Sequence, residues 1–413
     1  MTPIRFDLNS PEVIADPYPH YARLREDAPV HHDRELDLWV LSRHDDVAAA
    51  VRDHARFSSE SGGPWSDLSA NPFNPSTRVP APVAAAVERL LSPRVLLTSD
   101  PPDHTELRRK VAPAFTPRRI AAWEPRVREI TEGLLGGAAA RDGRIDLVRA
   151  LAAPLPSMVI AEMMGVPPGR RDRFRRWSDE AVDGLLAHGS LLRTLHGTAM
   201  MSAHFAAAVR RRRRDPRDDL IGLLVAGGDE APLSTGELVT FCVLLLVAGN
   251  ETTTNLISNT VLALLENPDA LEAVRADPGL AGAAVEETLR YDGPAQGLLR
   301  IAKADARFGD VTIPAGSRVL LLIASANRDP RRHPDPDAFR LDRGRADHLA
   351  FGTGVHYCIG HALARLESTV AIESLFRLGL APRLAGRPGR LDSPVLRGLR
   401  TLPLALERVP AGR

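Results

Sequence analysis

Cys358 is the residue whose surroundings most strongly suggest chemistry. It lies in the stretch AFGTGVHYCIGHALAR, close to Gly352, Gly354 and Gly360. An isolated cysteine is usually a small buried hydrophobic residue, and Cys242, between Phe and Val, fits that description. A packing cysteine does not need glycines around it. A backbone that lies against a flat ligand does need them, because a Cβ atom would collide with the ligand.

Three kinds of site could use this sulfur. The helical pattern that starts near Gly360 points its amide groups back at the loop, which stabilises a thiolate. A structural zinc site is disfavoured, because it needs about four ligands and the only local candidates are His356, Cys358 and His361. A nucleophilic cysteine is conceivable but requires no crowding by glycines. Ligation of a haem iron by one thiolate is the remaining interpretation, and it requires Arg or His donors for the haem carboxylates.

A second pattern places an acid and a hydroxyl inside an apolar helix. Glu251 and Thr252 follow the run FCVLLLV and the small residues Ala248 and Gly249. Small residues let a ligand approach the helix backbone closely, and buried polar groups are costly unless they are used. A helix cap is a poor explanation, because the apolar pattern continues on both sides. The pair is therefore a candidate for a functional role.

Helices must position most of these residues. Apolar side chains recur at helical spacing in the stretches 82–91, 120–140, 173–210, 234–266, 269–291 and 360–378. Short runs bounded by Pro, Gly or Asp predict strands at 38–43, 311–325 and 402–407. The mixture predicts a mainly α protein with a small β lobe.

Composition limits the class of protein. The 413 residues are 44% hydrophobic, carry a formal net charge of +1 and include two cysteines. We expect a single domain over residues 1–413, because no linker, low-complexity tract or repeat divides the chain. The longest apolar run, 241–249, is about half of the ~20 residues that a membrane span needs, and the N-terminal residues lack the apolar core of a signal peptide. We expect a cytoplasmic protein without disulfides or membrane contact.

The run VRRRRRDPRDD at 209–219 could suggest nucleic-acid binding. However, Asp215, Asp218 and Asp219 follow the arginines directly, and no aromatic residue interleaves them. Acids also balance bases over the whole chain. The run is better interpreted as the solvated end of a long helix, and we expect no nucleic-acid partner.

The glycine-rich loop resembles the haem-binding signature of the cytochrome P450 superfamily. The matching residues are Phe351, Gly352, Gly354, His356, Cys358, Gly360, Ala364 and Arg365. Three further segments are similar to motifs of that family and follow in its order: AGNETT to its oxygen-activating helix, EETLR to its Glu-x-x-Arg motif, and ANRDPRRHPDPDAFRLDR to its meander. The segments SDPPDHTELRRKVAPAFTPR and DPYPHYARLREDAPV also agree, so the resemblance covers nearly the whole chain. One departure is His333, where the family commonly has Phe.

The resemblance implies roles for particular residues. Cys358 would be the proximal ligand of the iron in haem b, and Phe351, Gly352 and Gly360 would also bind this cofactor. The residues that hold the haem carboxylates would be His104, Arg108, Arg300 and His356. His104 and Arg108 lie four apart and share one helix face, although a solvated surface pair is the alternative. Glu251 and Thr252 would relay protons, and a structural network would join Glu287, Arg290 and Arg343.

The resemblance also implies the activity, which is insertion of one oxygen atom from O2 into a hydrophobic or amphiphilic small molecule. Candidate substrate contacts, by analogy, are Leu244, Val247, Ala248, Gly297, Leu298, Leu299 and Leu396. Two alternatives are a peroxide-driven oxidase and a catalytically silent member that recruits a substrate or another protein. The intact pair of Glu251 and Thr252 argues against both.

Electrons are expected to come from separate proteins, a ferredoxin and an NAD(P)H-dependent ferredoxin reductase. Two cysteines cannot hold an iron–sulfur cluster that usually takes about four. Arg108, Arg109 and Lys110 form a basic group that could dock an acidic partner of this kind.

Overall fold

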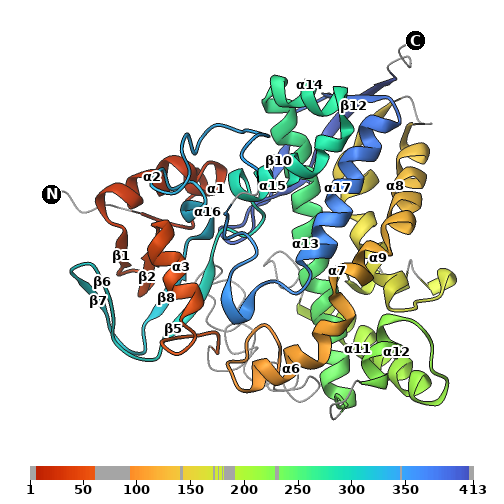
Figure 1. The fold of residues 1–413 in the computed structure, drawn as a ribbon, viewed down its shortest axis with the longest axis horizontal. Helices are drawn as coiled ribbons and strands as arrows, with labels where there is room; N and C mark the ends of the chain where they lie inside the picture. The colour runs from red at the N-terminus through yellow and green to blue at the C-terminus, as the bar shows by residue number, and fades with distance from the viewer. Residues whose placement is uncertain are drawn as a thin grey trace. The chain divides into compact units, whose positions relative to one another are not determined.

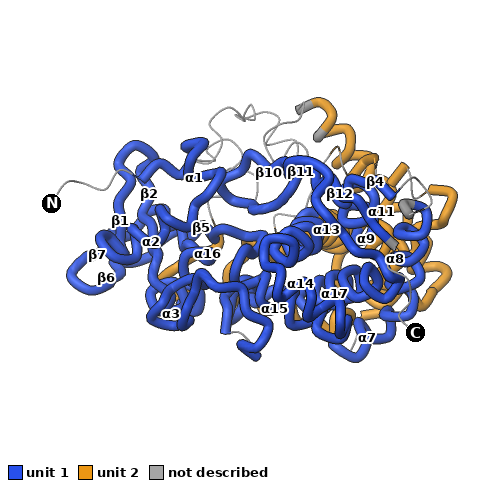
Figure 2. Tube along the Cα trace, turned by 90° about the horizontal axis from the view of Figure 1, so that it is seen from above, with its two compact units in different colours: residues 1–53, 117–156, 251–413 blue, residues 54–116, 157–250 orange. Residues whose placement is uncertain are grey.

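Helices dominate the computed structural model (Figure 1). It describes residues 6–60, 94–139, 143–170, 173–174, 176–178, 180, 191–227, 232–344 and 347–408. The chain divides into two compact units (Figure 2): unit 1 comprises residues 1–53, 117–156 and 251–413, and unit 2 comprises residues 54–116 and 157–250. Neither unit is a continuous stretch of sequence, and the single domain over 1–413 stays a prediction.

Unit 1 contains nearly all of the described strands. Its largest sheet has the order β1-β2-β8-β5, in which β2 and β8 are parallel and the other neighbours antiparallel. These strands are β1 (Val30–Asp33), β2 (Leu38–Leu41), β8 (Arg318–Leu321) and β5 (Leu298–Ala302). The smaller sheets combine β4 (Arg144–Asp146), β12 (Pro403–Arg408) and β9 (Leu380–Leu384), then β6 (Ala306–Phe308) with β7 (Val311–Ile313), and β10 (Gly389–Arg390) with β11 (Leu399–Thr401).

Several helices of unit 1 pack against one another. α17 (His361–Arg377) packs on α8 (Glu124–Ala139) and on α15 (Ala281–Tyr291). The aliphatic side chains of Val127 and Leu135 in α8 and of Leu375 in α17 are fully buried. The remaining helices are α1 (Pro11–Ala15), α2 (Tyr18–Asp27), α3 (His44–Arg52), α7 (Pro117–Ala121), η2 (Val148–Ala152), α14 (Pro268–Ala276), η4 (Pro278–Leu280), α16 (Ile323–Ala326) and η5 (Gly354–His356).

Unit 2 is built mainly from helices. Its elements are β3 (Phe57–Ser58), α6 (Asp103–Val111), η1 (Ala112–Phe115), η3 (Pro168–Arg170), α11 (Leu191–Arg214) and α12 (Leu220–Ala226). Two helices belong to both units: α9 (Pro154–Met163) begins in unit 1, and α13 (Thr235–Glu266) begins in unit 2 and ends in unit 1. α13 is the longest described helix, with 32 residues.

The predicted helices at 120–140, 234–266 and 360–378 agree with α7 and α8, α13 and α17. The pattern at 269–291 is interrupted, because Pro278 starts the short turn η4 between α14 and α15. The predicted strand at 311–325 is wrong over its length: Gly316, with φ +83°, lies in the turn between β7 and β8, and the chain then enters α16. Every residue of α16 is buried, so its apolar run resembles a buried strand. The stretch 82–91 and parts of 173–210 lie outside the described residues.

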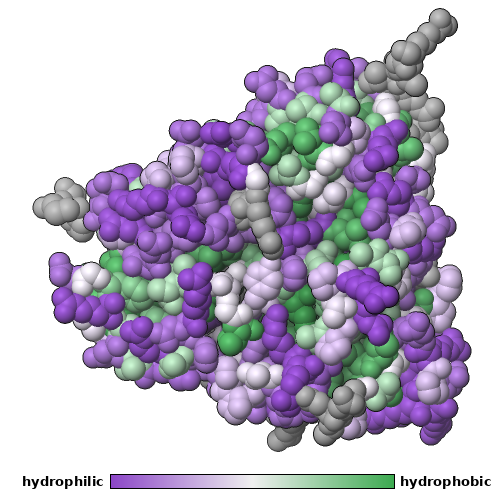
Figure 3. All heavy atoms as spheres, in the orientation of Figure 1, coloured by the Kyte–Doolittle hydropathy of each residue, from purple (hydrophilic) through white to green (hydrophobic). Residues whose placement is uncertain are grey.

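Polar side chains cover much of the molecular face drawn in Figure 3, with apolar groups in patches between them. None of the helices in the described ranges is long and apolar enough to cross a membrane.

Candidate functional site

Glycine conformation shapes the loop that carries Cys358. Gly352 and Gly354 have φ values of +68° and +71°, which residues with a Cβ atom rarely adopt. Gly354 also lies against α3, where an added Cβ would be 3.4 Å from the Cα of Arg52. The loop closes when the Cys358 N–H donates to the Phe351 carbonyl at 2.9 Å. Phe351, Gly352 and Cys358 are thereby brought together.

Cys358 has the surroundings that a single-sulfur haem ligand needs. It is half-buried and lies two residues before Gly360, the N-cap of α17, so the positive end of that helix adjoins it. A Cβ added at Gly360 would meet no described atom within 4 Å, which leaves this side of the loop accessible to a flat group. Within the described residues, no group of three or more His, Cys, Asp or Glu is placed to hold a metal ion. These features fit a haem.

A charged network holds the cysteine loop to the helices of unit 1. Arg365 of α17 donates from Nε to Glu286 of α15 at 2.5 Å, and its guanidinium lies 4.5 Å from the centre of the Phe351 ring. His348 Nε2 is 3.3 Å from the same carboxylate. Burial alone would raise the pKa of Glu286, but the hydrogen bonds with His348 and Arg365 outweigh it and lower the pKa to about 2. The ionised Glu286 therefore fixes both ends of the loop.

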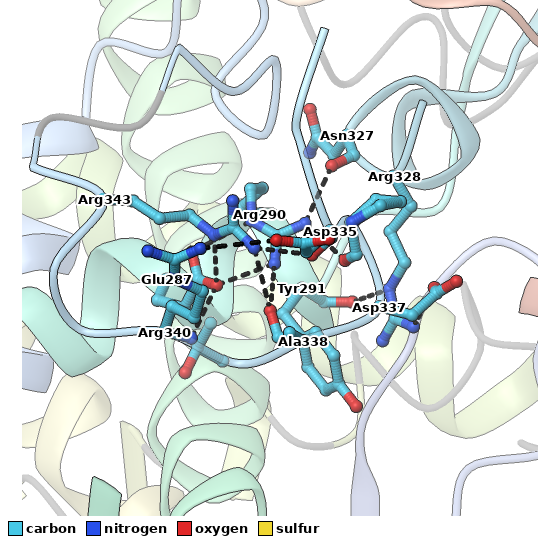
Figure 4. A network of polar contacts seen from close by, with 12 residues as sticks. Glu287, Arg290, Tyr291, Asn327, Arg328, Asp335, Asp337, Ala338, Arg340 and Arg343 are labelled. Atoms are coloured by element: carbon cyan, nitrogen blue, oxygen red, sulfur yellow. Dashed lines mark hydrogen bonds and ion pairs between the residues drawn. The ribbon is translucent and has the colours of Figure 1, made fainter. Parts of the chain in front are cut away.

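The three residues predicted to form a structural network lie together (Figure 4). Glu287 Oε1 accepts from Arg290 Nη2 at 2.7 Å and from Arg343 Nε at 3.0 Å, and Oε2 accepts from Arg290 Nε at 2.9 Å. The Arg340 backbone N–H adds a bond to Oε1 at 2.9 Å. Arg290 also donates to the carbonyl groups of Asn327, Pro336 and Ala338. The side chains of Glu287 and Arg290 are at most 1% exposed. The network that holds the meander at 326–343 against α15 is therefore buried.

Five of the six accessible residues between positions 244 and 252 of α13 share one helix face, and Gly249 is the sixth. Leu244, Val247, Glu251 and Thr252 are half-buried and Ala248 is exposed, whereas the residues flanking them at 241–243, 245–246 and 253–264 are buried. Their spacing of three and four residues places them in one stripe. Glu251 and Thr252 lie far from either end of α13, so the helix-cap alternative is wrong. The predicted relay pair and three predicted substrate contacts thus belong to one accessible stripe.

The other predicted substrate contacts come from two neighbouring segments of unit 1. Gly297 is buried immediately before β5, and the first two residues of that strand, Leu298 and Leu299, are half-buried. Leu396 is paired with Ala295 in an isolated antiparallel bridge. Leu396 therefore lies beside the segment that leads into Gly297 and β5.

The turn that carries Leu396 is anchored to α13. Asn259 donates from Nδ2 to the Arg397 carbonyl at 3.0 Å. Gly398 packs directly on Asn255, because an added Cβ would lie 2.0 Å from Oδ1 of that residue. Asn255 follows Glu251 by one helical turn, so the turn at Leu396 is held near the accessible stripe of α13.

Arg300 and His356 are the predicted carboxylate donors of unit 1. Arg300 is half-buried on β5, opposite Val319 of β8, and its Nη1 donates to the Leu299 carbonyl at 2.8 Å. His356 is half-buried in η5, two residues before Cys358. The two lie in different elements of unit 1, β5 and η5.

His104 and Arg108 are the predicted carboxylate donors of unit 2. His104 is 1% exposed, so the alternative of a solvated surface pair is wrong for it. Burial and the neighbouring Arg108 lower the pKa of His104 to about 4, against an opposing effect of Asp100. The imidazole is therefore neutral near pH 7 and has one N–H to donate.

The three basic residues at the end of α6 differ in their exposure to solvent. Lys110 Nζ contacts Glu106 at 2.6 Å, and the Lys110 side chain is only 11% exposed. Arg109 is exposed and Arg108 is half-buried. Of the three basic residues, Arg109 is therefore the one most accessible to a partner.

Sequence reasoning missed three residues that support the site: Glu286, Asn255 and Gly398. Glu286 stands beside Glu287, and only the fold shows that the two acids bind different partners. Asn255 could have been found from the sequence, because a polar side chain one turn after Glu251 in an apolar helix is costly to bury without a hydrogen-bond partner.

Comparisons with known proteins agree with this architecture. The family profile described as Cytochrome P450 matches residues 279–378. The chain is 41% identical over 402 residues to Cytochrome P450 107B1 of Saccharopolyspora erythraea, covering 94% of this chain and 95% of that one. It is 40% identical over 414 residues to the Vitamin D(3) 25-hydroxylase of Pseudonocardia autotrophica, covering 97% and 96%. The solved structure of CYP109E1 from Bacillus megaterium in complex with corticosterone matches with a TM-score of 0.83 at 32% identity, covering 95% and 99%. The predicted fold class is confirmed.

Proposed function

Because the chain belongs to the cytochrome P450 family and is a monooxygenase, we propose specific roles for its site residues. The Cys358 thiolate holds the iron of haem b, and Phe351, Gly352 and Gly360 form the loop surface against the cofactor. The bound haem supplies the redox chemistry that activates O2. The observation that carries the proposal is the accessible stripe of α13, in which an acid and a hydroxyl follow three small or aliphatic residues.

Glu251 and Thr252 are proposed to deliver protons at this stripe. Thr252 orders a donor water through its hydroxyl, and Glu251 exchanges protons between that water and solvent. Both side chains are half-buried, which suits groups that must contact a water molecule and the protein at once. Their position in the middle of a long helix holds them at a constant separation.

Arg300 and His356 are proposed to donate hydrogen bonds to the carboxylates of the haem. A guanidinium and an imidazole are suited to this task, because charge-assisted hydrogen bonds to a carboxylate are about twice as strong as neutral ones. His104 and Arg108 are proposed donors of the same kind. The burial of His104 supports a role inside the protein rather than at its surface.

The substrate is proposed to be a largely hydrophobic molecule with few polar groups. Leu244, Val247 and Ala248 make the stripe of α13 aliphatic. Gly297, Leu298, Leu299 and Leu396 of unit 1, which are apolar as well, are proposed as further substrate contacts. Vitamin D(3) and corticosterone, named for two relatives, have this chemistry. Electrons are proposed to come from a ferredoxin and its NAD(P)H-dependent reductase in the cytoplasm, with Arg109 at the docking surface.

The role of Cys358 is tested by the spectrum of the reduced protein with carbon monoxide. The wild-type protein should absorb at the long wavelength that gives the family its name, and Cys358→His should lose that band while still binding haem. A wild-type band typical of imidazole ligation would contradict the assignment.

The relay is tested by comparing product formed with NAD(P)H consumed and hydrogen peroxide released. Thr252→Val should still bind haem and substrate but should release peroxide, because the donor water is no longer ordered. Glu251→Gln should slow the whole cycle, since it removes the titrating group and keeps the shape. Tight coupling in Thr252→Val together with an unchanged rate in Glu251→Gln would exclude the relay and favour the peroxide-driven or silent alternatives.

A further inference from the structure

The structure divides the arginine run at the end of α11 into two groups. Arg212 is buried and donates from Nε to both carboxylate oxygens of Asp219, at 3.0 and 2.7 Å. Arg213 donates from Nη1 to Thr235 Oγ1 at 2.8 Å. These two arginines tie α11 to the starts of α12 and α13. The other group is exposed and lines a groove: Arg210, Arg211 and Arg214.

The groove has a volume of 460 Å³ and lies wholly within unit 2. One of its walls is a single face of α11, from Met200 through Ala203 and Ala207 to Arg214. These residues span about 21 Å along the helix at ~1.5 Å per residue. Trp177 adds a half-buried aromatic side chain to the apolar part.

The two ends of this α11 wall differ in chemistry. Small and apolar side chains occupy the end near Met200, whereas the other end has Arg210, Arg211 and Arg214, and Arg170 of η3 completes the cationic lining. Among the described residues that line the groove there is no carboxylate. The negative end of the α11 dipole stabilises cations in the last turn of this helix, but it is not a counter-ion for four guanidinium groups.

His204 lies on the same face of α11, between Met200 and Arg211. Its ring centre is 6.2 Å from that of Trp177. Burial lowers the pKa of His204, and the charges of Arg211 and Arg170 lower it further. The imidazole therefore stays neutral near pH 7 and leaves the cationic end of the groove to the arginines.

We propose that this groove binds an anionic amphiphile, with a phosphate or carboxylate head at the arginines and an aliphatic body along Met200 and Ala207. Guanidinium groups match both kinds of head, because they offer paired N–H donors in a planar fork. The volume lies within the ~300–1,000 Å³ of small-molecule sites. A groove with an apolar end and a cationic end selects a free amphiphilic molecule over a simple anion. None of its residues belongs to the proposed haem or substrate site.

Octyl phosphate is a suitable probe, measured by isothermal titration calorimetry on the haem-loaded enzyme. The iron is first saturated with 4-phenylimidazole, so that binding near the haem is blocked and the result does not depend on the proposed catalytic roles. Octyl phosphate should bind, and octanol and inorganic phosphate should each bind at least about tenfold more weakly, since each lacks one half of the complementarity. Binding should change tryptophan fluorescence in the wild type and not in Trp177→Phe.

Variants separate the groove from the rest of the basic surface. Arg211→Glu with Arg214→Glu should weaken octyl phosphate binding by at least about tenfold, because two charge-assisted contacts become repulsive. Arg217→Glu is the matched control: it reverses an exposed charge that pairs with Asp215 outside the groove, and it should leave binding unchanged. Ala207→Leu should weaken binding by filling the apolar part without altering charge.

Several outcomes would overturn the proposal. Equal binding of octyl phosphate and inorganic phosphate would show an adventitious ion only. Unchanged affinity in the double charge reversal would place the ligand elsewhere. Binding to vesicles that contain phosphatidylglycerol, without binding to monomeric octyl phosphate, would indicate a membrane surface instead of a site for a free molecule.

Discussion

Glu287→Gln tests the buried network that holds the meander. The Glu287 carboxylate accepts four hydrogen bonds, from Arg290 Nε and Nη2, from Arg343 Nε and from the Arg340 backbone N–H. A glutamine has one acceptor oxygen, and its NH2 group would face at least one of these donors. The change also leaves Arg290, whose side chain is 0% exposed, without a counter-charge.

The expected loss of unfolding free energy in Glu287→Gln is large. Breaking a buried ion pair by removal of one partner typically costs about 3–5 kcal/mol, because the remaining charge stays desolvated. Arg290 keeps its bonds to the carbonyl groups of Asn327, Pro336 and Ala338, which places the loss at the lower end, near ~3 kcal/mol. Because the meander leads into the Cys358 loop, the variant should also lose haem at a lower urea concentration than the wild type.

The assay is urea unfolding followed by far-ultraviolet circular dichroism and, in parallel, by the haem Soret band. Asp342→Asn is the matched control, since Asp342 pairs with Arg340 at 2.9 Å on the exposed side of the same segment and should show no measurable change. Equal unfolding midpoints for Glu287→Gln and Asp342→Asn would refute the reasoning. Loss of helix content without loss of haem would show that the network does not support the loop.

Three further predictions concern other parts of the chain. The pKa of Glu286 is lowered from 4.5 to about 2, so its ionised form stabilises the fold above pH 4.5, and this contribution is lost as the pH falls toward 2. Glu286→Gln should therefore have a lower urea midpoint than the wild type at pH 7, and the difference should become smaller near pH 3. An equal difference in urea midpoint at both pH values would contradict this. Gly398→Ala should cost about 1–3 kcal/mol because its Cβ would overlap Asn255, whereas Gly169→Ala, whose Cβ meets no described atom within 4 Å, is the control in the same urea titration. If ferredoxin docks near Arg109, reduction of the wild type should slow with salt, since exposed charges are screened over ~8 Å at physiological ionic strength, and Arg109→Glu should slow reduction at low salt; a salt-independent rate would exclude docking there.

Local geometry explains why parts of the site could be predicted from sequence. The loop before Cys358 depends on Gly352 and Gly354, whose positive φ values are a property of the residue type. The accessible stripe of α13 follows from the 3.6-residue period of a helix, so the shared face of Glu251 and Thr252 with the aliphatic residues before them is already present in their spacing. The network of Glu287 and Arg290 was predictable only as a motif, because residues three apart on a helix often form exposed pairs of little energetic value.

Partner choice could not be read from the sequence. Glu286 and Glu287 are adjacent acids in EETLR, yet Glu286 binds Arg365 and His348 while Glu287 binds Arg290 and Arg343. Neighbouring helix residues point in directions about 100° apart, and only the packing of α15 determines what lies in each direction.

The roles of the individual arginines in the run at 209–219 could not be predicted from the sequence either. Its sequence determined a cationic helix end, because five consecutive arginines cannot all be buried and the acids that follow end the helix in solvent. It did not determine which arginine would be structural. The tertiary structure decided that Arg212 is buried against Asp219 and that Arg211 and Arg214 face a groove. The physical reason is that charge and periodicity are properties of a segment, whereas a pocket or an ion pair requires a second segment brought close by the packing of the core.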